Sequence, residues 1–145
     1  REPQSMQTLP MKGDVVEEVV LFLKQQSECL KAVGVDSNRI VLDPGIGFGK
    51  TPEQNFSLLA RQSSLTVLGH PLLVGWSRKR SLGWALGDGA EHAHADVVAG
   101  RRVVASATAA LLAIQRGAHI VRVHDVQETA DAIKVWQAVQ SQPAH

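Results

Sequence analysis

Short apolar runs alternate along this chain with longer segments whose apolar residues recur at helical spacing. The apolar runs, each five or six residues long, span 39–43, 70–75 and 119–123. The segments with helical character span 14–33, a stretch that begins at Thr51, 101–116, and a stretch that follows Asp125, whereas 82–99 has no regular pattern. Continuous apolar strands alternating with amphipathic helices are typical of a parallel sheet covered by helices. The pattern therefore predicts the α/β class.

The predicted helices carry end signals. Asp14 has the side chain of an N-cap, and Gly34 is suited to end the same helix in a left-handed conformation. Thr51 with Gln54 three residues later predicts a capping box. Asp125 is expected to cap the last helix in the same way as Asp14.

Length and charge limit the classes of protein that this chain can represent. Its 145 residues suit one domain, 1–145, but a complete (β/α)8 barrel needs roughly 200 residues or more. A formal net charge of +1 gives no strong attraction to nucleic acid, and no apolar run approaches the ~20 residues of a membrane helix. The single cysteine, Cys29, suits a reducing compartment. We therefore expect a cytoplasmic protein that binds neither nucleic acid nor membranes.

Polar residues follow each of the three predicted strands. Asp43 ends the first, Ser77-Arg78-Lys79 follow the second, and Arg122 and His124 end the third. In parallel α/β folds the binding site lies where strands meet the loops that follow them. The three sets of side chains are therefore predicted to share one site, although for 77–79 taken alone a solvated basic turn is an open alternative.

The last strand predicts an anion site. Arg122 and His124 are two residues apart, so they point to the same face of a strand, and they stand in an apolar run. A buried guanidinium requires an anionic partner, and arginine is suited to bidentate phosphate binding. A structural Arg–Asp pair with a core-facing histidine is the alternative.

Two other motifs have competing interpretations. The end of the Gly-rich loop, Gly49-Lys50-Thr51, is similar to a phosphate-binding loop, but Pro44 stands where the first glycine of that motif belongs. We prefer a flexible turn that presents Asp43 and brings Phe48 over the site, with a tight capped turn as the simpler alternative. His92 and His94 could hold a metal, but two histidines in one loop more often have no such role.

The chain resembles the C-terminal half of dihydropteroate synthase. Four segments carry the resemblance: 6–19, 42–50 with its Asp-Pro-Gly-Ile-Gly-Phe-Gly-Lys run, 73–79 with Ser-Arg-Lys, and 117–126 with Arg-Val-His-Asp. The resemblance implies the C-terminal part of a TIM (β/α)8 barrel, with about three parallel strands that correspond to strands six to eight of the family. The family's first five strands have no counterpart here.

The family is a transferase of folate biosynthesis. It condenses 6-hydroxymethyl-7,8-dihydropterin pyrophosphate with p-aminobenzoate to give dihydropteroate and pyrophosphate, and sulfonamides compete with p-aminobenzoate. The resemblance implies these small-molecule partners, a possible homodimer, and Mg²⁺ whose protein ligand lies in the family's N-terminal half, with no metal ligand in this chain. We expect the chain alone to have little or no turnover.

The resemblance also implies roles for individual residues. Asp43, Lys79 and Arg122 would bind the pterin, Arg122 and His124 the pyrophosphate, and Ser77 and Phe48 would border the p-aminobenzoate pocket. No residue is assigned as a nucleophile or general base.

The chain departs from the family pattern at Trp76 and Ala105, where smaller residues are usual. Three alternatives remain: a pterin-binding methyltransferase-type domain, a non-catalytic module that binds pterin or phosphate, and a nucleotide-binding module.

Overall fold

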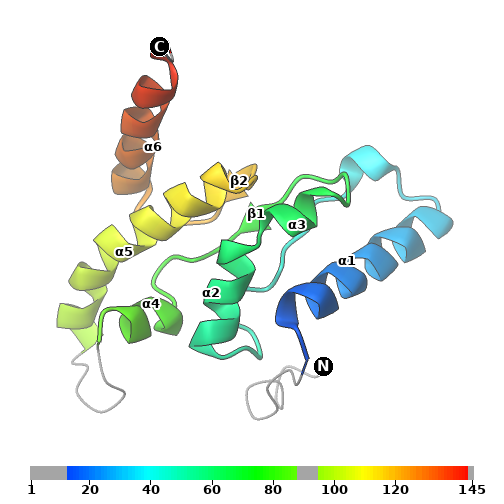
Figure 1. Cartoon of the computed structure of the whole chain (residues 1–145), viewed down its shortest axis with the longest axis horizontal. Coiled ribbons are helices and arrows are strands. Elements are labelled where there is room, and N and C mark those ends of the chain that lie inside the picture. The colour runs from blue at the N-terminus through cyan, green and yellow to red at the C-terminus, as the bar shows by residue number, and fades with distance from the viewer. Residues whose placement is uncertain (1–12, 88–94, 144–145) are drawn as a thin grey trace.

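The computed structural model describes residues 13–87 and 95–143, in which helices surround a small parallel sheet (Figure 1). The helices are α1 (Val15–Ala32), the 3-10 helix η1 (Ser37–Arg39), α2 (Pro52–Ala60), α3 (Ser63–Thr66), α4 (Arg80–Ala85), α5 (Ala95–Gln115) and α6 (Val126–Gln140). The strands are β1 (Leu73–Val74) and β2 (Ile120–Val121). The histidines His92 and His94 lie outside the described residues, as does the start of the first family-like segment.

The sheet is parallel, as predicted, but its strands are shorter than the apolar runs. In β1 and β2, Leu73 stands opposite Ile120 and Val74 opposite Val121. The predicted strand 39–43 contributes one isolated parallel bridge, from Leu42 to Leu72. Prolines limit the pairing, because Pro71 and Pro44 have no N–H to donate to a longer ladder. Pro71 does accept a hydrogen bond of 2.9 Å from the Leu42 N–H through its carbonyl.

Several helix ends agree with the capping signals of the sequence. The Asp14 side chain accepts hydrogen bonds from the N–H groups of Val16 and Glu17, at 2.9 and 3.3 Å. Thr51 and Gln54 form a reciprocal capping box at the start of α2. Gly34 follows α1 with a φ of +91°, the left-handed conformation expected after a helix.

Other elements differ from the prediction. Helix α5 begins at Ala95, six residues before the predicted start at 101, and α4 extends into the stretch 82–99, which has no regular pattern in the sequence. The short helices η1 and α3 were also not predicted. Elements of three to six residues complete at most two turns, so their apolar residues cannot show a period.

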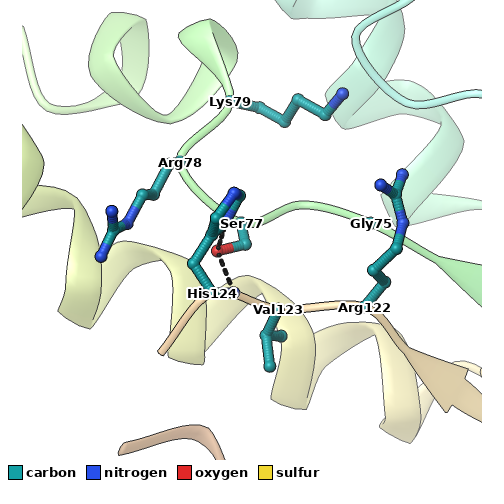
Figure 2. Close-up of a pocket in the computed structure, with 7 residues that line it drawn as sticks. All are labelled: Gly75, Ser77, Arg78, Lys79, Arg122, Val123 and His124. Atoms are coloured by element: carbon teal, nitrogen blue, oxygen red, sulfur yellow. Dashed lines mark hydrogen bonds between the residues drawn. The ribbon is translucent and has the colours of Figure 1, made fainter. Parts of the chain in front are cut away.

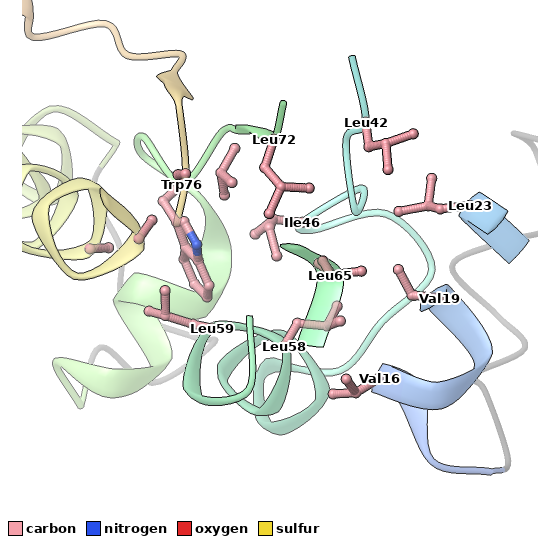
Figure 3. Close-up of a cluster of buried hydrophobic side chains, with 14 of the residues drawn as sticks. Val16, Val19, Leu23, Leu42, Ile46, Leu58, Leu59, Leu65, Leu72 and Trp76 are labelled. Carbon is pink, nitrogen blue, oxygen red and sulfur yellow. The ribbon is translucent and has the colours of Figure 1, made fainter. Parts of the chain in front are cut away.

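The hydrophobic core lies between the sheet and helices α1, α2 and α5 (Figure 3). Leu58, Leu65 and Leu72 are at most 1 % exposed. Trp76 is also 1 % exposed, and its ring packs against Phe56 with the centroids 5.2 Å apart. Trp76, where the resemblance implies a smaller residue, is thus a core residue, and its side chain does not line the pocket described below.

Helix α6 stands away from the rest of the chain and packs against α5 (Figure 1). Its Val126, Val135 and Val139 are more than 60 % exposed. Ala105 of α5, where the resemblance implies a smaller residue, is partly buried against the core. Among the described helices, none has the length and apolar character needed to cross a membrane.

Candidate functional site

A pocket of about 370 Å³ opens where β1 and β2 meet the loops that follow them (Figure 2). It is lined by Gly75, Ser77, Arg78, Lys79, Arg122, Val123 and His124. Four of the six predicted site residues thus lie together here. The other two, Asp43 and Phe48, do not line it.

Arg122 lies against the backbone of the neighbouring strand. A Cβ atom placed on Gly75 would be 3.0 Å from Arg122 Nη2 and 3.4 Å from Nε, so the missing side chain leaves room for the guanidinium. Arg122 is exposed, and the expectation of a buried charge within a strand was therefore wrong. The reason is that β2 ends at Val121, which leaves Arg122 in the open loop.

Ser77 holds His124 by two contacts. The buried Ser77 Oγ accepts a hydrogen bond of 3.1 Å from the His124 backbone N–H and lies 2.9 Å from His124 Nδ1. The imidazole itself is exposed to the pocket. Since Nδ1 is engaged by Ser77, the Nε2 atom is the ring nitrogen that remains for a ligand.

The ammonium group of Lys79 is influenced by the positive charge of Arg122 and the negative charge of Asp43. Its Nζ lies 4.2 Å from the centroid of the Phe48 ring, a cation–π contact. Partial burial lowers the pKa of Lys79, and the positive charge of Arg122 lowers it further, while the Asp43 carboxylate opposes both effects. A bound anion would relieve the repulsion between Lys79 and Arg122.

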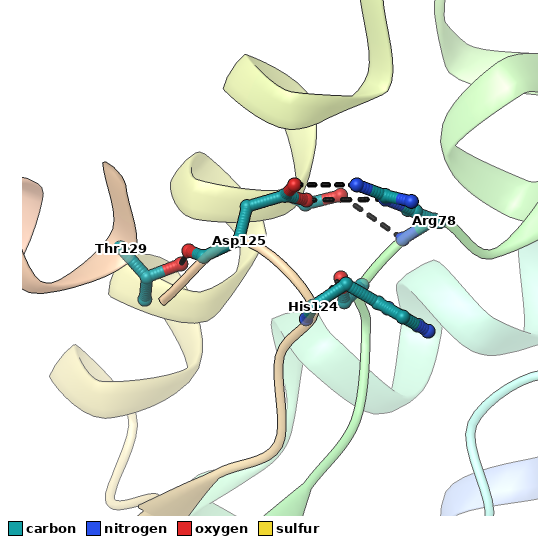
Figure 4. A network of polar contacts seen from close by, with 6 residues as sticks. Arg78, His124, Asp125 and Thr129 are labelled. Carbon is teal, nitrogen blue, oxygen red and sulfur yellow. Dashed lines mark hydrogen bonds and ion pairs between the residues drawn. The ribbon is translucent and has the colours of Figure 1, made fainter. Parts of the chain in front are cut away.

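Asp125 does not cap α6 with its side chain, contrary to prediction. Its carboxylate instead accepts two hydrogen bonds from Arg78, from Nη2 to Oδ1 at 2.6 Å and from Nε to Oδ2 at 3.2 Å (Figure 4). These bonds lower the pKa of Asp125 and raise that of Arg78. A structural Arg–Asp pair is therefore present, as one alternative suggested, but it involves Arg78 rather than Arg122.

The Gly-rich loop folds back on itself. Asp43 is exposed at its start and accepts a hydrogen bond of 2.8 Å from Gly45 N–H. Lys50 donates to the carbonyls of Gly45 and Phe48, at 2.9 and 3.1 Å. In a nucleotide-binding loop this lysine would reach outward to phosphates. The contacts of Lys50 therefore favour the interpretation of the loop as a turn that presents Asp43, rather than as a nucleotide-binding site.

Asn55 is a supporting residue that the sequence interpretation missed. It is 1 % exposed, its Oδ1 accepts a hydrogen bond from Gly47 N–H at 2.9 Å, and its Nδ2 donates to Ser81 Oγ at 3.0 Å. It thereby joins the Gly-rich loop to α4, which follows Lys79. The sequence did carry a signal for a buried polar side chain at this position. Asn55 stands three residues before Leu58 and four before Leu59, so it shares the apolar face of α2 with them.

The described residues contain no cluster of three histidine, cysteine or acidic side chains that could hold a metal ion. The pocket is instead cationic. Lys79, Arg122 and His124 converge on it, and donors of this kind bind diphosphates and stabilise the charge of a departing oxygen.

Comparison with known proteins gives relatives over nearly the whole chain. The dihydropteroate synthase of Haemophilus influenzae is 41 % identical over 138 residues, which cover 94 % of this chain and 46 % of that protein. The chain thus spans about half the length of the curated relatives it matches.

Solved structures agree with the sequence relatives. The dihydropteroate synthase of Stenotrophomonas maltophilia, solved with imidazole in its active site, superposes with a TM-score of 0.89 at 46 % identity, covering 99 % of this chain and 51 % of that one. The Xanthomonas albilineans enzyme in complex with 7,8-dihydropteroate gives a TM-score of 0.84 at 46 % identity, covering 92 % and 48 %. The sequence profile of the pterin binding enzymes matches residues 1–124. The chain belongs to the pterin-binding enzyme family.

Proposed function

We propose that this chain forms the C-terminal half of a dihydropteroate synthase barrel. The reaction would join 6-hydroxymethyl-7,8-dihydropterin pyrophosphate to 4-aminobenzoate and release pyrophosphate. The observation that carries the proposal is the convergence of Lys79, Arg122 and His124 on one pocket at the strand ends. The relative in complex with 7,8-dihydropteroate supports the assignment of the product.

The chemistry requires charge stabilisation rather than a side-chain nucleophile. The bond between the pterin methylene carbon and the pyrophosphate oxygen breaks, and the electron pair leaves with the oxygen. Arg122 and His124 would stabilise that growing negative charge. The amine of 4-aminobenzoate then attacks the methylene carbon, and its surplus proton passes to solvent. Positioning of the two substrates contributes the rest of the rate.

The pterin would lie between the Gly-rich loop and the pocket. Asp43 would accept hydrogen bonds from the N–H groups of the pterin, and Lys79 would donate to an acceptor atom of its ring. Arg122, whose guanidinium lies over Gly75, would contact both the pterin and the pyrophosphate. This placement is supported by the electrostatic influence of both Asp43 and Arg122 on Lys79.

Ser77 and Phe48 would border the 4-aminobenzoate. The Ser77 hydroxyl already contacts His124, so it would act at the edge of that substrate as well as on the imidazole. Phe48 is 47 % exposed beside Lys79, which leaves a ring face available for an aromatic substrate. Mg²⁺ would need ligands from beyond the described residues and from the pyrophosphate itself, and no step is assigned to it.

The test is complementation between two half-barrels. The 145-residue chain alone should form little dihydropteroate, whereas the chain fused behind the N-terminal half of the Stenotrophomonas maltophilia enzyme should form it readily. Within the fusion, Arg122→Ala should lower kcat by about 100-fold or more, as loss of an oxyanion donor does. The control variant Arg39→Ala removes an exposed positive charge outside the pocket and should leave kcat unchanged. A folded fusion that binds the pterin substrate but forms no product would reject the proposal in favour of a binding module.

A further inference from the structure

The parallel register of β1 and β2 continues beyond the sheet as a series of side-chain contacts. The paired strand residues, Leu73 with Ile120 and Val74 with Val121, are 47 positions apart. Gly75 and Arg122, Ser77 and His124, and Arg78 and Asp125 keep the same separation. Since the backbone ladder ends before the pocket, these contacts hold the two loops together where the site residues lie.

Arg78 is the most constrained member of this series. Its φ is +58°, a left-handed conformation that is disfavoured for residues with a side chain. Its backbone N–H donates to Ser106 Oγ of α5 at 3.0 Å, and its side chain bonds both oxygens of Asp125. Figure 2 shows its guanidinium turned away from Lys79 and Arg122. The side chain therefore connects two loops instead of adding a third cation to the pocket.

His124 lies between the two contacts. Its neighbour Asp125 is held by Arg78, and its own N–H and ring are held by Ser77. Because Ser77 Oγ accepts the His124 backbone hydrogen, the hydroxyl proton of Ser77 is available for Nδ1 of a neutral imidazole. When Ser77 donates to Nδ1 in this way, the ring proton lies on Nε2, which then faces the pocket as a donor.

We propose that Arg78 and Asp125 are positioning residues that keep His124 bonded to Ser77, so that its Nε2–H is presented to an anion in the pocket. Only the identity of the anion as a diphosphate rests on the proposed function.

The experiment uses the isotope-labelled 145-residue chain and two readouts. Two-bond ¹H–¹⁵N spectra of His124 report which ring nitrogen carries the proton, and contacts between the His124 ring and the Ser77 methylene protons report its orientation. Calorimetric titration with inorganic pyrophosphate then reports the Kd. The variants are Asp125→Asn, Arg78→Gln and the two combined.

The chain offers a matched control in the ion pair of Arg61 and Asp14. This pair is also bidentate, with contacts of 2.8 and 2.5 Å, and also joins residues 47 positions apart. Asp14→Asn breaks the pair while keeping a side chain that caps helices well. It should leave His124 and the pyrophosphate Kd unchanged.

Each single pocket variant should release the His124 ring from Ser77, mix the two tautomers and raise the pyrophosphate Kd about two- to tenfold, the cost of ordering one side chain on binding. The double variant should be no worse than either single one, because both remove the same contact. An unchanged His124 in a folded Asp125→Asn chain would overturn the proposal. So would unfolding of both single variants, since the pair would then serve stability alone. If wild type binds no pyrophosphate but Asp125→Asn still releases the ring, the positioning stands and the assignment of the anion as a diphosphate fails, whereas the proposed function is decided by the fusion.

Discussion

Replacing Gly47 by alanine tests the close approach of the Gly-rich loop to Lys79, because it adds a single methyl group at that contact. Its φ is +81°, in the left-handed region that favours glycine. A Cβ atom there would stand 2.9 Å from Lys79 Cδ and 3.3 Å from its Nζ. Gly47→Ala therefore imposes a strained backbone and also displaces the lysine from the Phe48 ring.

The two effects add to a measurable loss. The left-handed conformation costs an alanine roughly 1–2 kcal/mol relative to glycine. Rotation of the flexible Lys79 side chain relieves the clash but gives up a cation–π contact of about 0.5–1 kcal/mol. We expect Gly47→Ala to lower the free energy of unfolding by about 2 kcal/mol. Displacing the ammonium toward solvent should also raise the pKa of Lys79 toward its ordinary value, because partial burial is the main cause of its depression.

Gly69→Ala is the matched control. Gly69 has a φ of +70°, but a Cβ atom there would meet nothing within 4 Å. Urea unfolding should show a loss of roughly 1–2 kcal/mol for this variant, and NMR titration should show the same Lys79 pKa as in wild type. The reasoning is refuted if Gly47→Ala is as stable as wild type, or if it leaves the Lys79 pKa where Gly69→Ala leaves it.

Three further outcomes follow from the fold. Asn55→Ala should cost about 1–3 kcal/mol in urea unfolding by leaving buried partners unsatisfied, and an unchanged stability would contradict the contacts of that side chain. Leu72→Ala should cost about 2–5 kcal/mol in the same assay, since Leu72 is fully buried, and a loss under 1 kcal/mol would mean that the core collapses around the gap. Hydrogen bonds from Arg61 lower the pKa of Asp14 to about 2, so their stabilisation is complete above about pH 4 and is lost as the pH falls toward 2. Asp14→Asn should remove that part of the acid dependence, and an unaltered pH profile would show that the pair contributes nothing.

The starts of α1 and α2 were predictable because capping is local. Asp14, Thr51 and Gln54 bond to backbone groups within a few residues of themselves, so their contacts can be inferred from spacing alone. Strand lengths were not predictable in this way. Pairing at Leu42 and Leu72 depends on which groups of the neighbouring segment can donate, and Pro71 cannot.

The candidate site likewise has features that were predictable from the sequence and one that was not. The order of the strands and the polar residues after each of them were enough to predict that Ser77, Lys79, Arg122 and His124 would meet. The partner of Asp125 was not predictable, because helix capping and pairing with Arg78 are both chemically sound uses of one carboxylate.

The amino-acid sequence by itself determined the α/β order, the caps of α1 and α2, and the polar side chains that follow the strands, because these depend on periodicity and on neighbours along the chain. Only the tertiary structure decided that Arg122 is exposed over Gly75, that Lys50 folds back on its own loop, and that Arg78 binds Asp125. The positions of Arg122 and Arg78 depend on the register between segments 47 residues apart, where a shift of one residue would exchange one set of partners for another. Lys50 instead bonds within its own loop, where spacing alone leaves both an inward and an outward direction open to its long side chain.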